Sequence, residues 1–207
     1  MLTVIANLKG GSGKSTVIFN LALWLKEKDQ NIITFDLDPQ GTLSDVADVR
    51  KDEGFEELEV LTDVNEIKNH LDKNVLVDVG ASNMHDMKLA IKLADRVLIP
   101  VSPSQPDLWA TQRFLKIVKE CNSDDKPLEL LAFVNRADTH TMVRESDETE
   151  EALNTIKSIK VLPHRLCQRT MFRRTLSEGM SINEISPNSK SAKEFNILAS
   201  ALYADLV

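Results

Sequence analysis

Glycines, lysines and hydroxyl residues crowd one short segment near the N-terminus, "KGGSGKST" at residues 9–16. Glycines at this spacing let backbone N–H groups converge on phosphate oxygens, and a helix that starts here adds the positive end of its dipole. Lys14 is placed to reach the β- and γ-phosphates of a nucleotide, and the Ser15 hydroxyl to ligate Mg²⁺. The segment departs from the usual G-x-x-x-x-G-K-[ST] pattern because Leu8 replaces the first glycine. A glycine turn that merely joins a strand to a helix is the alternative. The predicted nucleotide-binding residues of this segment are Lys9, Gly10, Gly11, Ser12, Gly13, Lys14, Ser15 and Thr16.

Three aspartates stand where apolar runs end. "FDLDPQG" at residues 35–41 carries Asp36 and Asp38, and "VLVDVGA" at residues 75–81 carries Asp78. In an open parallel sheet, ligands bind outside the carboxyl ends of the strands, so we expect these side chains beside the glycine-rich loop. Asp78 is predicted to hold Mg²⁺ through water, and Asp38 to orient an attacking water or a Mg²⁺-bound water. Asp36 is a further candidate metal ligand, with a cap or turn residue as the alternative.

The elements that must position these residues alternate along the chain. The expected strands are Thr3–Leu8, Asn31–Asp38, Asn74–Gly80, Arg96–Ser102, Leu128–Arg136 and Ile159–His164. Most are continuous apolar runs, which is typical of strands buried on both faces in a parallel sheet covered by helices. The expected helices are Lys14–Lys28, Met84–Ala94, Leu108–Cys121, Glu148–Ile159 and Ser191–Leu206. The acidic run "ESDETEE" at residues 145–151 is expected to open a helix, where it suits the dipole, and the less regular Gly41–Leu71 to hold a short helix and an extra strand. This order predicts an α/β fold in a single domain over residues 1–207, with a doubly wound, mostly parallel sheet flanked by helices.

Composition and charge exclude several classes of protein. The 207 residues carry a formal net charge of -7, so attraction to nucleic acid or an anionic membrane must come from a local patch. The two cysteines, Cys121 and Cys167, form no C-x-x-C pair, which argues against a disulfide framework and against a zinc or iron–sulfur site. No apolar run reaches the roughly 18 residues of a membrane span, and no basic region precedes the first apolar run as in a signal peptide. We therefore expect a cytoplasmic protein without a membrane partner.

The motifs "KGGSGKST", "FDLDPQ" and "VLVDVGAS", in this order and spacing, resemble those of the deviant Walker A ATPases, the ParA/MinD family of P-loop NTPases. The "DPQ" and the compact length resemble the small ParA-type members, which partition plasmids and other large cargo. The resemblance implies ATP and Mg²⁺ as cofactors, slow ATP hydrolysis, and a homodimer that sandwiches two ATP molecules. It also implies that Lys9 reaches the phosphates bound by the partner subunit; an exposed lysine at a strand end is the alternative. The expected catalytic residues are Lys9, Lys14 and Asp38.

The same resemblance extends to the base of the nucleotide. "FVNRAD" at residues 133–138 is similar to the family's adenine-side motif, which implies that Asn135 hydrogen-bonds the base and that Arg136 could stack on it. Pro163, in the loop "VLPH", is expected on the other side of the base. An asparagine–arginine turn without a ligand is the alternative.

A basic segment, "HRLCQRTMFRRTLSEG" at residues 164–179, reverses the charge of this acidic chain locally. Arg169 and Arg173 are four residues apart and would share a face of a helix. Resemblance to ParA-type proteins implies sequence-neutral DNA binding through phosphate contacts, which depends strongly on salt. A solvated or ion-paired arginine face is the alternative. The candidate DNA-binding residues are Arg165, Arg169, Arg173, Arg174, Lys190 and Lys193.

These expectations combine into one function. The chain is predicted to be a nucleoid-associated, ATP-dependent dimerising switch that binds DNA without sequence preference and positions cargo through a small ParB-like or cargo adaptor. The cargo would be a plasmid, a chromosome locus or a protein body such as a carboxysome. A MinD-like membrane switch is an alternative, although "EFNILASALYADLV" has no cation after Lys193 to form a basic amphipathic tail. A metabolic P-loop phosphotransferase is another, for which no acceptor pocket can be identified in the sequence.

Overall fold

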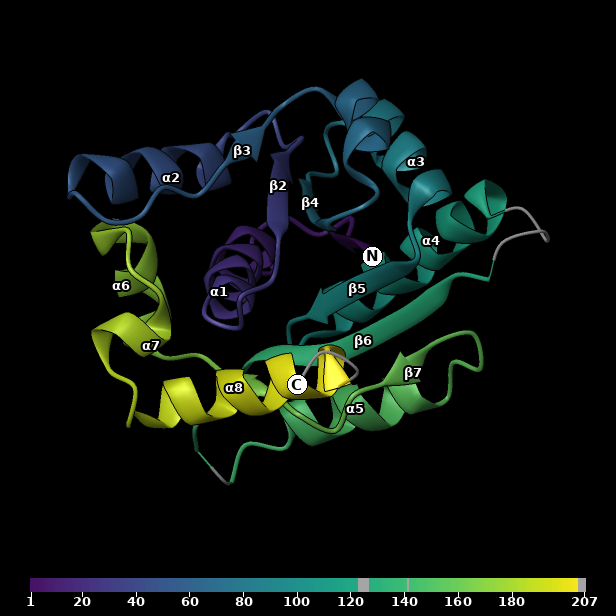
Figure 1. Cartoon of the computed structure of the whole chain (residues 1–207). Helices are drawn as coiled ribbons and strands as arrows, with labels where there is room; N and C mark the ends of the chain where they lie inside the picture. Colours follow the sequence, from purple (N-terminus) through teal and green to yellow (C-terminus); the bar gives the residue numbers. More distant parts are fainter. Residues whose placement is uncertain (123–126, 141, 205–207) are drawn as a thin grey trace.

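The computed structural model describes residues 1–122, 127–140 and 142–204. Its strands run in the spatial order β3-β2-β4-β1-β5-β6-β7, with β8 paired to β6 (Figure 1), and every pairing between them is parallel. The strands are β1 (Leu2–Ala6), β2 (Ile32–Asp36), β3 (Val60–Leu61), β4 (Asn74–Val79), β5 (Arg96–Val101), β6 (Glu129–Ala137), β7 (Lys160–Val161) and β8 (Leu166–Cys167). The prediction of a doubly wound parallel sheet is therefore confirmed.

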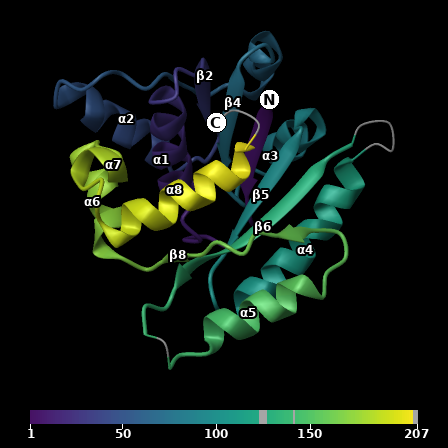
Figure 2. The same ribbon diagram turned by 60° about the horizontal axis from the view of Figure 1, so that its bottom comes forward.

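Helices cover both faces of this sheet, as Figure 2 shows. The first face is covered by the 3₁₀-helix η1 (Val64–His70) together with α3 (Met84–Leu93), α4 (Gln105–Cys121) and α5 (Glu145–Asn154). The second face is covered by α1 (Lys14–Lys26), α2 (Thr42–Asp52), α6 (Thr170–Glu178), α7 (Ile182–Ile185) and α8 (Lys190–Leu202). The two layers bury separate hydrophobic cores on opposite sides of the strands.

The central strands supply both cores, which explains their continuous apolar sequences. In β1, Val4 packs into the core under α3 and α4, whereas Ile5 packs into the core under α1 and α8. In β4, likewise, Val77 packs into the first of these cores and Leu76 into the second. Successive side chains of a strand point to opposite faces, so a strand covered on both faces needs an apolar residue at every position.

Several element boundaries differ from the sequence prediction, and a capping side chain sets one of them. The helix expected from Leu108 begins at Gln105, because the Ser104 hydroxyl accepts a hydrogen bond from the Asp107 backbone N–H. The helix expected at Glu148–Ile159 begins with the acidic run, at Glu145, and ends at Asn154. The last helix ends at Leu202, and the final residues of its expected range lie outside the described residues.

The segment after β7 folds into elements that the strand and helix prediction lacks. It forms β8, the amphipathic α6 and the short α7, whose start is fixed by a reciprocal capping box between Ser181 and Glu184. Within Gly41–Leu71, by contrast, the expected short helix and extra strand are both present, as α2 and β3, together with η1. No helix in the described ranges combines the length and the apolar character needed to cross a membrane.

Candidate functional site

The glycine-rich loop joins the central strand β1 to α1, where two of its glycines adopt the left-handed backbone conformation. Gly11 has φ of 76° and Gly13 has φ of 87°, values that other residues adopt only with strain. Gly13 is also the N-cap of α1, and a Cβ there would lie 2.5 Å from Nδ2 of Asn135. That Nδ2 donates a hydrogen bond of 2.6 Å to the carbonyl oxygen of Ser12. The loop conformation therefore depends on glycine at position 13 for two separate reasons.

The entry to the loop is held by Asn7, a residue that the sequence analysis did not single out. Its side chain is 0% exposed. Nδ2 donates to the carbonyl oxygen of Pro100 in β5 at 3.0 Å, and Oδ1 accepts from the Lys9 backbone N–H at 3.3 Å. A buried amide directly after an apolar strand was the available signal, because such a group must find partners.

Buried polar groups without partners lie around this loop. The Ser12 hydroxyl oxygen and both carboxylate oxygens of Asp78 have no hydrogen-bond partner within the described part of the chain. Burial raises the pKa of Asp78 to about 7, although the nearby Ser15 hydroxyl and Lys14 ammonium act in the opposite direction. Lys14 is itself buried and forms no ion pair with a described residue. Unmet groups of both charges fit a bound phosphate together with a hydrated cation.

Ser15 and Asp78 lie close together beside the phosphate loop, where the sequence analysis expects them to hold Mg²⁺ with water between the ion and Asp78. No three His, Cys, Asp or Glu side chains in residues 1–122, 127–140 and 142–204 are grouped closely enough to hold a metal ion by themselves. An ion here would take most of its ligands from phosphates and water, which is usual for Mg²⁺. When bound, it would neutralise charge on the phosphates.

The other two aspartates have different surroundings. The Asp36 carboxylate accepts hydrogen bonds from the Asp38 backbone N–H at 3.2 Å and from the Ser44 backbone N–H and hydroxyl at 2.9 and 3.0 Å. Asp36 therefore shapes the turn that leads into α2, as the turn-residue alternative describes, and its role as a metal ligand stays a prediction. Asp38 is half-buried, and its carboxylate packs so closely on Gly80 that a Cβ there would collide with it. Its position at the carboxyl end of the sheet agrees with the prediction.

Lys9 stands at the mouth of the loop with an exposed side chain. Only its backbone N–H has a hydrogen bond, and its ammonium group has no ion pair within the described residues. Among the described residues, the ammonium group is therefore available to a ligand.

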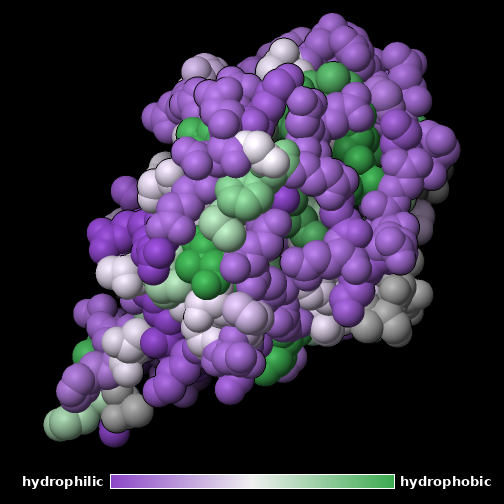
Figure 3. Space-filling view, turned by 60° about the vertical axis from the view of Figure 1, so that its left-hand side comes forward, coloured by the Kyte–Doolittle hydropathy of each residue, from purple (hydrophilic) through white to green (hydrophobic). Residues whose placement is uncertain are grey.

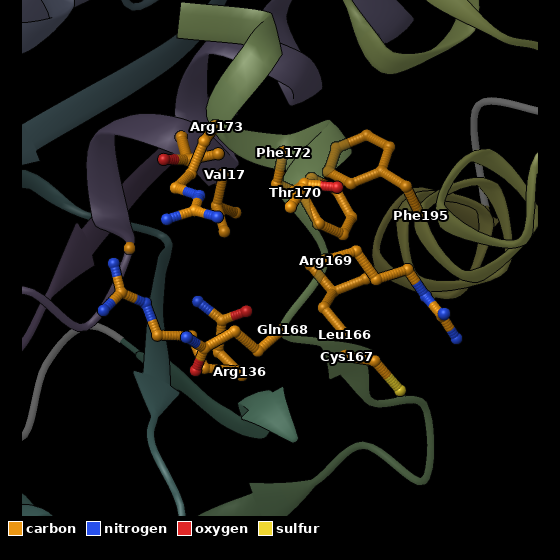
Figure 4. A pocket seen from close by; sticks show the side chains of 13 residues that line it. Val17, Arg136, Leu166, Cys167, Gln168, Arg169, Thr170, Phe172, Arg173 and Phe195 are labelled. Carbon is orange, nitrogen blue, oxygen red and sulfur yellow. The ribbon is translucent and has the colours of Figure 1, made fainter. Parts of the chain in front are cut away.

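A cavity of about 300 Å³ extends from the phosphate loop between α1, β6 and α6. Asn135 and Arg136 line it, as expected for residues beside the base, although the Asn135 amide nitrogen is already used by Ser12. Arg136 takes φ of 57°, an uncommon conformation for a residue with a side chain. Pro163 is exposed and is not among the lining residues, so the cavity gives no support to its expected place beside the base. The wall is built instead by β8 and the start of α6, as Figure 4 shows for Leu166, Gln168 and Thr170.

Three of the six candidate DNA-binding residues are neutralised within the chain. Arg165 forms ion pairs with Asp147 and Glu150. Arg169 pairs with Glu194, and Arg174 pairs with Glu178 four residues later.

The basic segment is thus largely the ion-paired face that the sequence left open as an alternative. The expectation that Arg169 and Arg173 share a face of one helix is also wrong. Arg169 is the N-cap of α6 and has extended backbone angles, so it precedes the helix. Arg173, Lys190 and Lys193 are exposed and have no ion pair within the described residues.

The central parallel strand, the glycine loop at a helix N-terminus and the buried carboxylate on the neighbouring strand define a P-loop nucleotide-binding protein. A family model, described as the CobQ/CobB/MinD/ParA nucleotide binding domain, matches residues 3–182. The chain belongs to this family, and the resemblance seen in the sequence motifs is confirmed.

Individual relatives agree with this assignment. The chain is 29% identical over 199 residues to the maintenance of carboxysome distribution protein A of Halothiobacillus neapolitanus, covering 92% of this chain and 90% of that protein. Among solved structures, apo McdA from Cyanothece superposes with a TM-score of 0.74 at 18% identity, covering 97% of this chain and 98% of that one. The septum site-determining protein MinD of Pyrococcus horikoshii, complexed with Mg-ADP, gives a TM-score of 0.75 at 19% identity, covering 98% and 95%. At these identities the structures establish the shared fold.

Proposed function

We propose that this protein is an ATP-hydrolysing switch of the ParA type, which forms a homodimer around two ATP molecules and positions a large cargo. The observation that carries the proposal is Lys9. The phosphate loop already has its own cation in Lys14, and Lys9 is a second lysine at its mouth, exposed and without an ion pair among the described residues. Across a dimer interface it would meet the phosphates of the partner's nucleotide. A charge supplied in this way stabilises phosphoryl transfer.

The names of similar proteins support positioning as the task. One relative is named for carboxysome distribution, another is the ParA protein of Rhizobium radiobacter, and one similar structure is a putative plasmid partition protein of Borrelia burgdorferi bound to AMPPNP. We propose accordingly that this protein acts in the cytoplasm through a small adaptor that contacts the cargo. Ser15, with Asp78 through water, would hold Mg²⁺, and Asp38 would orient the attacking water.

We further propose that the ATP-bound dimer binds DNA without sequence preference. The face that carries α2, α6 and α7 is mostly hydrophilic, with hydrophobic residues in separate small groups (Figure 3). After the ion pairs are taken into account, Lys190 and Lys193 are the cations best placed for phosphate contacts. They lie three residues apart on the first turns of α8, where a helix N-terminus also favours an anion. Two copies aligned by the dimer would track a duplex backbone.

The decisive experiment measures mass by light scattering with Mg²⁺ and a non-hydrolysable ATP analogue. The wild-type protein should become a dimer, Lys14→Ala should bind no analogue, and Lys9→Ala should bind the analogue but lose closure of the dimer or ATP turnover. Lys190→Gln with Lys193→Gln should dimerise normally and bind arbitrary duplex DNA more weakly at low salt. A wild-type protein that stays monomeric under saturating analogue, or a Lys9→Ala variant with normal turnover, would contradict the proposal.

A further inference from the structure

Arg173 differs from the arginines around it. Arg169 is held by Glu194, and Arg174 is held by Glu178 on the outer side of α6. Arg173 is exposed, yet its guanidinium group has no hydrogen bond or ion pair within the described residues. It is also the one of the three that projects over the cavity beside the phosphate loop, because Figure 4 shows the Arg169 guanidinium directed away from that cavity.

The cavity has a polar end and an apolar end. Gly13 and Thr16 connect it to the phosphate loop, so phosphates bound by that loop place the nucleoside within the cavity. On one side Figure 4 shows Arg173 beside Val17, with Arg136 below them. On the other side are the rings of Phe172 and Phe195, whose centroids lie 6.4 Å apart.

A guanidinium group binds phosphate oxygens, and it is equally suited to the nucleoside that this cavity would hold. It is planar and weakly hydrated, and it stacks on flat aromatic systems while its N–H groups donate to oxygens at the rim. We infer that Arg173 binds the nucleoside of the bound nucleotide, with its guanidinium group against the base, and that it does not belong to the DNA-binding surface. This assignment rests on the proposed nucleotide-binding function.

The position of Arg173 along α6 supports this assignment. Phe172, its neighbour, is partly buried in the core under α1 and α8 and lines the same cavity, so the first turn of α6 is fixed relative to the phosphate loop. Thr175, two residues on, is fully buried and receives a hydrogen bond from Asn20 of α1 at 3.2 Å. Arg173 is therefore a long side chain on a rigid support at the rim of the cavity.

The test is the affinity of three probes, ATP, ADP and inorganic tripolyphosphate, for the wild-type protein, R173A, R173K and the matched control R174A. R174A removes the same charge from the next position of the same helix. We expect R173A to lower the affinity for ATP and for ADP by roughly 10-fold each, and the affinity for tripolyphosphate by less than about 2-fold, because only the first two probes carry a base. R173K should resemble R173A, since an ammonium group keeps the charge without the planar surface. R174A should bind all three probes as the wild-type protein does.

The possible failures are separable. If R173A binds ATP normally but the ATP-bound variant loses DNA affinity, Arg173 belongs to the DNA-binding surface and the inference is overturned. Equal weakening of tripolyphosphate, or full recovery in R173K, would show that only charge matters and would also overturn it. A wild-type protein that binds tripolyphosphate but neither nucleotide would reject the proposed function together with this inference.

Discussion

Replacing Asp78 by Asn should make the nucleotide-free protein more stable at pH 8. The carboxyl group is 0% exposed, has no hydrogen-bond partner within the described residues, and has a pKa raised from 3.8 to about 7, chiefly by burial. The difference between these two values corresponds to about 4 kcal/mol, at about 1.4 kcal/mol per pH unit. Between about pH 4 and pH 7 the unfolded chain has lost this proton while the folded protein keeps it, so stability falls as the pH rises. Above pH 7 the free energy of unfolding stays lower by the full cost of burying the ionised Asp78 carboxylate.

The expected gain is smaller than this upper limit. The Asn amide would also be buried without partners, at a cost of about 1–3 kcal/mol. We therefore expect Asp78→Asn to raise the free energy of unfolding at pH 8 by about 1–3 kcal/mol, and to flatten its decline between pH 5 and pH 7. Denaturant titration without nucleotide at pH 5, 6, 7 and 8 measures both effects, and the difference from wild type removes the contribution of other titrating groups.

Two further measurements separate function from stability. Asp48→Asn, on the exposed surface of α2, is the matched control and should leave the pH dependence unchanged. Binding of Mg-nucleotide should weaken in Asp78→Asn even though its fold is more stable, because we propose that the carboxylate holds the hydrated ion. If the variant were no more stable than wild type at pH 8, or showed the same decline between pH 5 and pH 7, the raised pKa of Asp78 would be refuted.

Two other substitutions test the loop and its supporting structure. Gly13→Ala should lower ATP affinity by at least about 10-fold without unfolding the protein, because φ of 87° costs about 1–2 kcal/mol for alanine and the new methyl group meets Asn135. Fluorescence titration with an ATP analogue measures this affinity. A normal affinity would contradict the loop geometry. Arg50→Ala should destabilise the protein by about 3 kcal/mol, because it removes a buried arginine that pairs with both Glu184 oxygens at 2.9 Å. Lys51→Ala, whose partner Glu57 is largely exposed, is its control in denaturant titration and should change little; equal losses in the two variants would count against the buried pair.

The fold and the phosphate site could be predicted because local sequence determines them. An apolar residue at every position identifies a strand covered on both faces, and a glycine loop between such a strand and a helix identifies the phosphate site. The role of Asn7 could not be predicted in this way, because its main partner, Pro100, lies 93 residues away. Nor could the ion pairs of Arg165 and Arg169, whose acidic partners lie 15 to 25 residues distant and approach only in the folded chain.

The segment after β7 shows a second limit of sequence reasoning. Its arginines suggest a basic surface when they are read as a group. In the structure, the residues between them build β8 and α6, and five of these residues line the cavity beside the phosphate loop: Leu166, Cys167, Gln168, Thr170 and Phe172. A charge count along the chain cannot distinguish an arginine that is neutralised by a distant glutamate from one that remains free. Only the tertiary structure makes this distinction.

The carboxylate of Glu194 connects the cavity wall at Cys167 and Arg169 to the helix α8. It accepts hydrogen bonds from the Cys167 backbone N–H and from the Arg169 guanidinium group, both at the wall of the cavity, while its own backbone lies in α8 next to Lys193. A displacement of that wall would therefore act, through the contacts of Glu194, on the helix that carries Lys190 and Lys193. Through these contacts of Glu194, the position of α8 on the outer surface would depend on whether the cavity holds a ligand.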